Sequence, residues 1–346
     1  MQNPTYENVH NLFKLNGFHL KKDDLCRVAY SFIKEGDDFE IPVGDFLLDW
    51  FDSKTFIEME TSGSTGVPKT IRVDKQAMVN SALATGDFFN LSPGDKVLHC
   101  LPVKYVAGKM MLVRSLILGL DLDFVAPSSH PLKNNDTMYD FVAMVPLQAQ
   151  NSLAELGKVK KLIVGGAKIG AGLEADLMQS TSKVFETFGM TETISHIAAK
   201  KVGEKAFTVF PDVTISKDSN NCLVIRAPRV SNDEIISNDL VDIIDYNKFV
   251  FLGRRDNVIN SGGVKLIPEQ IEQKLAGTIK NRFFIHSKSD TNLGEKVILV
   301  IEGDRHEIDS SIFEGLDKYE KPKEVIFVPV FKQTENGKII RRESLQ

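Results

Sequence analysis

The sequence predicts an α/β protein with a large N-terminal layered α/β domain and a small, mobile α+β domain at its C-terminal end. Short apolar runs alternate with helical stretches through the first two thirds of the chain, which is typical of a layered sheet. After about residue 205 the pattern changes to turn-rich hairpins and a compact mixture of short helices and strands. With 346 residues, of which 42% are hydrophobic, the chain is long enough to bury two cores.

The first structural unit expected along the chain is a strand, a loop and a returning strand. Residues 56–60 alternate like a strand, residues 61–66 are all glycine, serine or threonine, and residues 70–73 alternate again. Asp74 is placed to cap a helix over residues 75–89. Further sheet strands are expected at 97–101, 121–125, 141–145, 162–164 and 184–187.

The last third predicts the smaller domain. A hairpin is expected over 212–226, followed by strands between 235 and 252, and Gly253-Arg254-Arg255-Asp256 then breaks the pattern. We therefore expect residues 1–255 to form the large domain and residues 256–346 the small one. In the small domain we expect helices over 268–275 and 307–316, and strands over 283–286, 297–301 and 324–328.

Composition excludes several classes of function. A net charge of -5 argues against a nucleic-acid binder, which would carry a basic face. Cys26, Cys100 and Cys222 are too scattered for a metal site or a disulfide framework, which fits a reducing cytoplasm. No secretory signal begins the chain, and no stretch is long and apolar enough to insert into a membrane. We expect a cytoplasmic protein.

The strongest chemical signal is the segment T-S-G-S-T-G-V-P-K-T at residues 61–70. Its glycines allow close approach of backbone N–H groups to an anion, its hydroxyls add donors, and its lysine adds a charge. It is not the nucleotide-triphosphatase loop, because Pro68 stands where that motif needs glycine and a strand follows where that motif opens a helix. We expect a polyphosphate cradle formed by Thr61, Ser62, Gly63, Ser64, Thr65, Gly66 and Lys69.

This segment resembles the phosphate loop of the adenylate-forming superfamily, which contains acyl-CoA synthetases, peptide-synthetase adenylation domains and luciferases. Other motifs of that superfamily follow in its order, from about residue 60 to the end of the chain. They are V-G-G-A at 164–167, T-F-G-M-T-E-T at 187–193, N-D-L at 238–240, G-R-R-D at 253–256, S-G-G at 261–263, P-E-Q-I-E at 268–272 and T-E-N-G-K-I-I-R at 334–341.

The resemblance implies a nucleotide site. Asp239 would accept hydrogen bonds from the ribose hydroxyls, with Arg254 beside it. Phe188, which replaces the superfamily's tyrosine, would offer an apolar face to adenine or, as the alternative, would be a core aromatic residue. The segments expected along the adenosine also contain Gly165, Gly166, Ala167, Thr187 and Gly189.

The resemblance also implies the catalytic groups. Glu192 would hold Mg²⁺, a hard cation that prefers oxygen ligands, and the Thr191 hydroxyl would donate to the α-phosphate. Lys338 would stabilise the charge that develops there in the transition state. Members of the superfamily rotate the small domain about the position of Asp256, and Gly263 corresponds to a glycine that lines the path of the coenzyme A thiol; a simple turn is the alternative for Gly263.

Residues 101–114 resemble the acyl-pocket segment of o-succinylbenzoate–CoA ligases. Tyr105 replaces the usual histidine, Gly108 matches, and Arg114 falls at the position of that subfamily's arginine. An arginine within an apolar helix is costly unless an anion pairs with it; the alternative is an arginine on the surface of the helix. Ser195 and His196 also resemble this subfamily.

One departure is the short segment before the phosphate loop, which has 60 residues where the superfamily has a longer subdomain. A reduced N-terminal subdomain favours a compact acid and leaves room for a homo-oligomer in which a partner subunit covers the gap.

The predicted function is an ATP-dependent acid–thiol ligase that forms an acyl-AMP and then an acyl-CoA, with ATP, Mg²⁺ and coenzyme A, and with o-succinylbenzoate as the expected acid. The alternatives are a ligase for another acyl or aryl acid, a free-standing adenylation enzyme that loads a carrier-protein thiol, and a nucleotide-binding module without turnover. The presence of both Glu192 and Lys338 argues against the last alternative.

Overall fold

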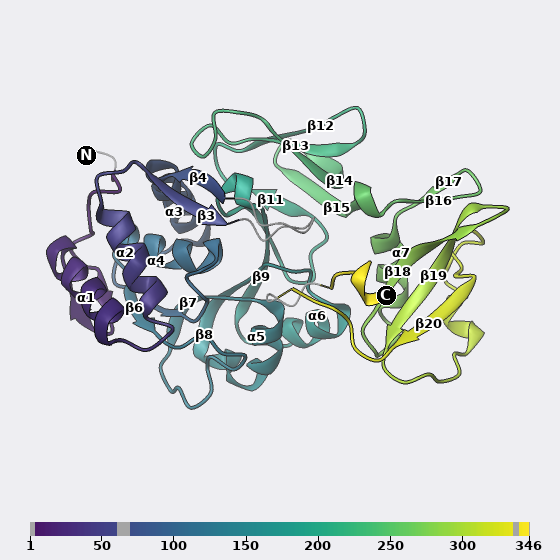
Figure 1. Ribbon diagram of the computed structural model, residues 1–346, viewed down its shortest axis with the longest axis horizontal. Helices are drawn as coiled ribbons and strands as arrows, with labels where there is room; N and C mark the ends of the chain where they lie inside the picture. The colour runs from purple at the N-terminus through teal and green to yellow at the C-terminus, as the bar shows by residue number, and fades with distance from the viewer. Residues whose placement is uncertain (1–3, 61–69, 335–338, 346) are drawn as a thin grey trace. The chain divides into compact units, whose positions relative to one another are not determined.

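The computed structural model describes residues 4–60, 70–334 and 339–345 (Figure 1). The chain divides into two compact units. Unit 1 comprises Met1–Gly165, Gln179–Thr214 and Arg226–Ile235, and unit 2 comprises Gly166–Met178, Ile215–Ile225 and Ile236–Gln346. The boundary expected between residues 255 and 256, and the mobility expected of the small domain, stay predictions.

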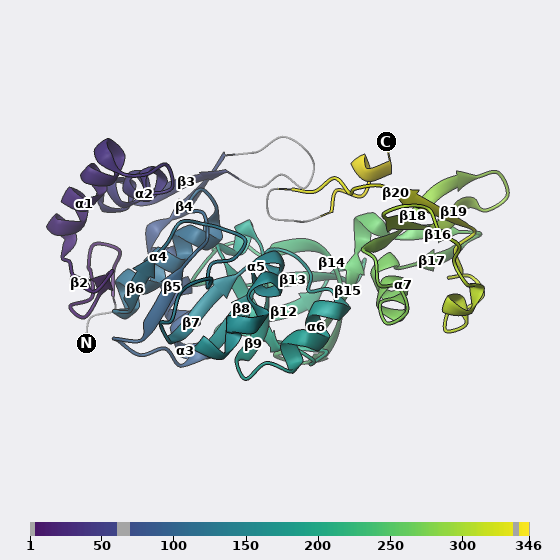
Figure 2. The same ribbon diagram turned by 90° about the horizontal axis from the view of Figure 1, so that it is seen from below.

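Unit 1 is built on a sheet whose central strands are parallel, as the α/β class requires. Strands β5 to β9 pair with one another in parallel, β10 and β11 continue the sheet antiparallel, and β1 joins β6 at the other end. Figure 2 shows β6, β5, β7, β8 and β9 side by side. In sheet order the strands are β11 (Phe207–Val209), β10 (His196–Lys201), β9 (Lys183–Gly189), β8 (Val159–Val164), β7 (Tyr139–Met144), β5 (Lys96–His99), β6 (Asp121–Phe124), β1 (Lys14–Leu15) and β2 (Phe18–His19).

The two strands expected on either side of residues 61–69 are present. Strands β3 (Phe56–Glu60) and β4 (Thr70–Asp74) pair antiparallel in a sheet of their own. The residues between them lie outside the described part of the chain.

Two helices of unit 1 carry the buried polar residues discussed below. Helix α3 (Lys75–Phe89) follows β4, and its first turn is capped as predicted, because the Asp74 carboxylate accepts a hydrogen bond from the Ala77 N–H at 2.8 Å. Helix α4 (Val106–Leu118) ends at Gly119, whose φ of 73° closes the helix in the left-handed conformation. The two helices pack against each other.

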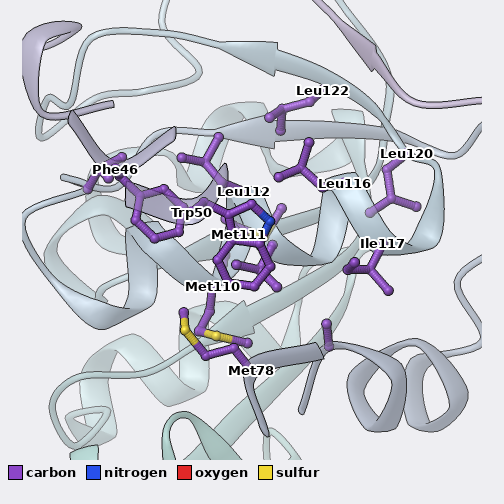
Figure 3. Packing of buried hydrophobic residues seen from close by; sticks show 14 of the residues in the cluster. Phe46, Trp50, Met78, Met110, Met111, Leu112, Leu116, Ile117, Leu120 and Leu122 are labelled. Atoms are coloured by element: carbon purple, nitrogen blue, oxygen red, sulfur yellow. The ribbon is translucent and has the colours of Figure 1, made fainter. Parts of the chain in front are cut away.

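Within the first 60 residues the chain forms helices α1 (Lys22–Glu35) and α2 (Ile41–Phe51), which pack side by side (Figure 1). Phe46 and Trp50 of α2 belong to the same core cluster as Met110 and Met111 of α4, and Figure 3 shows the four side chains within that cluster. Burial of each large apolar side chain contributes about 1.5–3 kcal/mol. The short segment therefore supplies apolar cover for α4 from its own residues.

Unit 2 contains an antiparallel group of strands and a second sheet. The second sheet runs β17-β16-β19-β18, with β20 parallel to β19, and helix α7 (Pro268–Leu275) packs on β18. The strands are β12 (Thr214–Lys217), β13 (Cys222–Arg226), β14 (Ile235–Asp245), β15 (Lys248–Arg254), β16 (Ile259–Ser261), β17 (Val264–Leu266), β18 (Phe283–Asp290), β19 (Gly294–Glu302) and β20 (Glu324–Val328). The α+β character predicted for this end of the chain is confirmed.

The helix predicted over residues 307–316 is wrong. Only a short 3-10 turn forms there, Ser310–Phe313. The Asp309 carboxylate accepts a hydrogen bond from the Ser311 N–H at 2.9 Å, and short polar side chains that bond to the backbone in this way compete with helix formation. Within the described residues, no helix has the length and apolar character needed to cross a membrane.

Candidate functional site

Arg114 is buried in α4, with an exposed fraction of 2%, so the alternative of a surface arginine is excluded. Its partners are neutral. Nε donates to Thr85 Oγ1 at 3.3 Å, Nη2 donates to Ser195 Oγ at 2.7 Å, and Nη1 contacts Met111 Sδ at 3.9 Å. Across residues 4–60, 70–334 and 339–345, no carboxylate pairs with this guanidinium.

The charges in this cluster are set by burial. Burial lowers the pKa of Arg114 to about 9, so the guanidinium is still a cation at neutral pH. Burial, and then the charge of Arg114, hold the pKa of His196 well below its ordinary value. The cluster therefore carries one positive charge at neutral pH, and because a buried charge is costly when unpaired, it suits an anion.

His196 and Thr85 complete the cluster. Thr85 Oγ1 lies 3.0 Å from His196 Nε2 and also donates to the Ser81 carbonyl at 2.9 Å. On the other side of the imidazole ring, Ser195 Oγ lies 3.5 Å from His196 Nδ1. Thr85 is fully buried, and it belongs to α3, whereas Arg114 belongs to α4.

The position of Ser195 depends on a strained turn. Ile194, which is buried, has φ 64° and ψ -47°, and the Ser195 N–H donates to the Thr193 carbonyl at 2.6 Å. This is a γ-turn with positive φ at its central residue, which is unusual for a β-branched side chain. Strain of this kind is of the order of 1–3 kcal/mol and gathers at functional sites.

Thr191 and Glu192 lie on the 3-10 turn Thr191–Thr193 (η2), which joins β9 to β10. Glu192 is exposed. Among the described residues, no three His, Cys, Asp or Glu side chains gather into a metal site. Mg²⁺ is commonly bound by one or two carboxylates together with substrate phosphates and water, so Glu192 fits a magnesium ion that arrives with a phosphate ligand.

The segments expected along the adenosine are the carboxyl ends of the adjacent parallel strands β8 and β9, the edge where α/β sheets bind ligands. A side chain at Gly165 would collide with Thr187 Oγ1 at 2.6 Å, and one at Gly189 would collide with the Ser195 carbonyl. Phe188 packs against Phe207, with ring centroids 5.7 Å apart.

Gly166 follows Gly165 with a φ of 84°, in the left-handed region that favours glycine. Gly166 and Ala167 begin a segment that belongs to unit 2. The contact of these two residues with adenosine stays a prediction.

The acyl-pocket segment folds back tightly before α4. A side chain at Gly108 would lie 2.3 Å from the Pro102 carbonyl oxygen, which explains the glycine, and Tyr105 is the residue that precedes the helix. His99 Nε2 lies 3.0 Å from the Gly108 carbonyl oxygen. Burial lowers the pKa of His99 to about 4, so this anchor is neutral.

In unit 2 the predicted ribose-binding acid and its arginine are neighbours. Asp239 of β14 and Arg254 of β15 face each other in the antiparallel register, with Arg254 Nη1 3.3 Å from Asp239 Oδ1. Asp256 Oδ2 lies 3.6 Å from Arg254 Nη2 and accepts from Asn238 Nδ2 at 3.2 Å.

Gly263 has a structural explanation that needs no ligand. Gly262 and Gly263 have φ values of 59° and 84° and form the two-residue turn between β16 and β17. A two-residue hairpin turn with both residues left-handed strongly favours glycine. Among the described residues, no atom lies within 4 Å of a side chain built at Gly263. The thiol path at Gly263 and the hinge at Asp256 stay predictions.

Eight predicted site residues lie outside the described part of the chain, and their roles stay predictions: Thr61, Ser62, Gly63, Ser64, Thr65, Gly66, Lys69 and Lys338.

The sequence did not lead us to Thr85, Ile194 or His99. Thr85 lies four residues from Ser81, so the sequence puts two hydroxyls on one side of the helix, but it does not show what they contact.

Comparison with known proteins identifies the family of this chain. The AMP-binding enzyme family model matches residues 57–216. A crystal structure from Dyadobacter fermentans DSM 18053, described as an acyl-CoA synthetase (AMP-forming)/AMP-acid ligase II-like protein, is 34% identical and has a TM-score of 0.63, with 92% of this chain and 97% of that chain covered. The chain belongs to the AMP-binding enzyme family.

Within the family, the chain is similar to 2-succinylbenzoate–CoA ligase of Escherichia coli (strain K12), at 26% identity over 310 residues, 83% of this chain and 67% of that protein. The chain spans about two thirds of the length of such curated relatives, with shares of 65% to 69%. The O-succinylbenzoate coenzyme A synthetase of Bacillus subtilis, solved with ATP and magnesium ion, has the same fold, with a TM-score of 0.73 at 18% identity over 84% of this chain and 69% of that chain.

Proposed function

We propose that this protein is an ATP-dependent acid–thiol ligase, which joins a carboxylic acid to AMP and then transfers the acyl group to coenzyme A. Membership of the AMP-binding enzyme family supports the adenylating step. The pairing of Asp239 with Arg254 supports the nucleotide site, because it presents a buried carboxylate acceptor beside a cation. ATP with magnesium is bound by the Bacillus subtilis relative, and we extend both to this chain. We also propose a cytoplasmic location, which the scattered cysteines fit.

The acid in this proposal has a second anionic group, with o-succinylbenzoate as the specific candidate. The observation that carries the proposal is the buried Arg114, whose partners in the described chain are hydroxyls and a thioether. One carboxylate of o-succinylbenzoate reacts, and the other would pair with Arg114. A charge-assisted hydrogen bond of this kind is worth about 1.5–3 kcal/mol.

The chain's own groups would divide the chemistry between them. Glu192 would hold the magnesium ion, which supplies charge neutralisation at the phosphates. Thr191 would donate to the α-phosphate, and Lys338 would stabilise the charge gathered there while the acid's carboxylate attacks. The carboxylate oxygen forms the new bond to phosphorus, and the bond to pyrophosphate breaks. In the second step the coenzyme A thiolate attacks the acyl carbon and AMP leaves.

A transfer to a carrier-protein thiol is the second candidate for the acceptor, and other dicarboxylic acids are candidates for the substrate. Release of pyrophosphate from ATP, measured across a panel of acids, tests the adenylating step and the choice of acid. The same assay with and without coenzyme A tests the acceptor. We expect release to depend on an acid with two carboxylates and acyl-CoA to form only when coenzyme A is added. Equal release with monocarboxylic acids would contradict the role of Arg114, and no release with any acid would contradict the ligase itself.

A further inference from the structure

We propose that Thr85 is a positioning residue for the acid substrate, because its hydroxyl fixes both the guanidinium of Arg114 and the tautomer of His196. The proposal rests on the proposed function for the identity of the acid, although its structural half does not. Thr85 lies on α3, outside the motifs that carry the family resemblance.

The hydroxyl proton of Thr85 has two possible acceptors. A threonine hydroxyl has one proton to donate and two lone pairs that accept. Thr85 Oγ1 has three partners: the Ser81 carbonyl oxygen at 2.9 Å, His196 Nε2 at 3.0 Å and Arg114 Nε at 3.3 Å. The carbonyl only accepts and the guanidinium only donates. The Thr85 proton therefore goes either to Ser81 or to His196.

Which of the two acceptors takes the Thr85 proton depends on the hydrogen bonds on the other side of the imidazole ring. If Thr85 donates to Ser81, His196 carries its proton on Nε2 and donates it to Thr85, and His196 Nδ1 accepts from the Ser195 hydroxyl. Ser195 Oγ then accepts from Arg114 Nη2, and every group has a partner. If Thr85 donates to His196 instead, Nδ1 carries the proton, and Ser195 receives two donors while its own proton has no acceptor in this ring. The complete ring is favoured, because it gives every donor and acceptor a partner, whereas the other arrangement leaves the partly buried Ser195 hydroxyl without an acceptor in the ring.

Arg114 is oriented by Thr85 together with Ser195. Its side chain is held at two points, Nε by α3 through Thr85 and Nη2 by the β9–β10 turn through Ser195. Two points fix the plane of the guanidinium. One bond alone would let the plane rotate, and the substrate would then have to order it at a cost in affinity. Thr85 thereby raises affinity for the second carboxylate without touching the substrate.

The kinetic test replaces Thr85 by valine, which keeps the shape and removes the hydroxyl. Thr85→Val should raise the Michaelis constant for o-succinylbenzoate about tenfold, with kcat and the Michaelis constant for ATP within about twofold of the wild type. Thr85→Ser restores the hydroxyl and should return the constant for the acid to within about twofold.

The matched control is Ser115→Ala. Ser115 is fully buried on α4 next to Arg114 in sequence, and its hydroxyl donates to the Met111 carbonyl at 2.8 Å, the same bond to the preceding turn that Thr85 makes with Ser81. Ser115→Ala should lower the free energy of unfolding about as much as Thr85→Val does, and it should leave the Michaelis constant for the acid unchanged. An equal rise in Ser115→Ala and Thr85→Val would show that both act through general loosening, and would overturn the positioning role.

A second measurement separates this proposal from the proposed function. Nitrogen NMR of the ¹⁵N-labelled histidines in the full chain, with His196 assigned from the spectrum of His196→Gln, reports the tautomer without any substrate. We expect neutral His196 with its proton on Nε2, and a shift toward Nδ1 protonation in Thr85→Val. A proton on Nδ1 in the wild type, or an unchanged spectrum in Thr85→Val, overturns the proposal. If no dicarboxylic acid is used but the spectra behave as expected, the substrate assignment fails and the structural role of Thr85 stands.

Discussion

Arg341 of unit 2 and Arg114 of unit 1 differ in the charge of their partners. Arg341 of unit 2 is ion-paired: Nη1 lies 2.9 Å from Glu272 Oε1, Nη2 lies 3.4 Å from Glu269 Oε1, and Nη1 also donates to the Ile285 carbonyl at 2.9 Å. Arg114 of unit 1 is the more buried of the two, and in the described chain it has only uncharged partners.

Arg341 finds its two carboxylate partners, Glu269 and Glu272, within the protein itself. Burial raises the pKa of Glu272 even though Arg341 acts in the opposite direction, so desolvation is the stronger effect at this carboxylate. Because its partners are carboxylates of the same unit, Arg341 belongs to the architecture of unit 2. Arg114 lacks the acid that Arg341 has, and a charge left in that state is available to a ligand. Removal of Arg341 should therefore lower the stability of the protein, whereas removal of Arg114 should lower its affinity for the acid.

The largest effect is expected for Arg341→Leu. Removal of one partner from a buried ion pair costs about 3–5 kcal/mol, because the remaining carboxylates are left buried without a cation. Unfolding by urea, followed on a signal from unit 2, should show this loss. A loss of less than about 1 kcal/mol in the free energy of unfolding would mean that solvent or other groups satisfy Glu269 and Glu272. Arg341 would then not be a structural arginine, and the contrast with Arg114 would fail.

Arg114→Leu should lose affinity and not stability. The apparent Michaelis constant for o-succinylbenzoate should rise about ten- to a hundredfold, since a charge-assisted hydrogen bond is lost, while the constant for ATP stays nearly unchanged. The free energy of unfolding should be unchanged or higher than in the wild type, because an uncompensated buried charge is removed. Destabilisation by several kcal/mol would show that Arg114 is structural, as Arg341 is.

The pH dependence of acid binding gives a smaller effect. The pKa of Arg114 is lowered to about 9 by burial, and the cation is the form that binds a carboxylate. As the pH rises through 9, the Michaelis constant for the acid should rise, approaching tenfold per pH unit, in the adenylation half-reaction of the wild type. Arg114→Leu should show no such rise. A wild-type constant that stays level up to pH 10.5 would mean that the guanidinium titrates higher.

Much of the fold followed from local sequence signals. Helix α3 begins and ends where the pattern predicts: Asp74 caps its first turn, and Asn90 closes it in the left-handed conformation. Helix α7 begins at Pro268 as expected. The strand expected over 97–101 ends at His99, short of Pro102, which cannot donate to a ladder. Helices α1 and α2 were not predicted, since they pack against each other and place their apolar residues in the common core of unit 1.

The candidate site was predictable where one motif contained the whole argument. Arg114 was expected to be buried because its neighbours are apolar, and it is. Thr85 was out of reach, because its role exists only where α3 packs against α4 and brings residues 29 positions apart together. The turn at Ile194 was also out of reach, since no local preference of a β-branched residue predicts a positive φ. Two interpretations were open for Gly263, a turn and a thiol path. The structure confirms the turn, and the thiol path stays a prediction.

The most direct test of the account is a comparison of two acids in two proteins. The acids are o-succinylbenzoate and its analogue with the non-reacting carboxylate masked as a methyl ester, and the proteins are the wild type and Arg114→Leu. The quantity measured is the ratio of kcat/KM for the two acids, from pyrophosphate release at saturating ATP. We expect the wild type to favour the free dicarboxylate by about ten- to a hundredfold and the variant to bring the ratio close to one. The same ratio in both proteins would contradict the claim that Arg114 binds the second carboxylate.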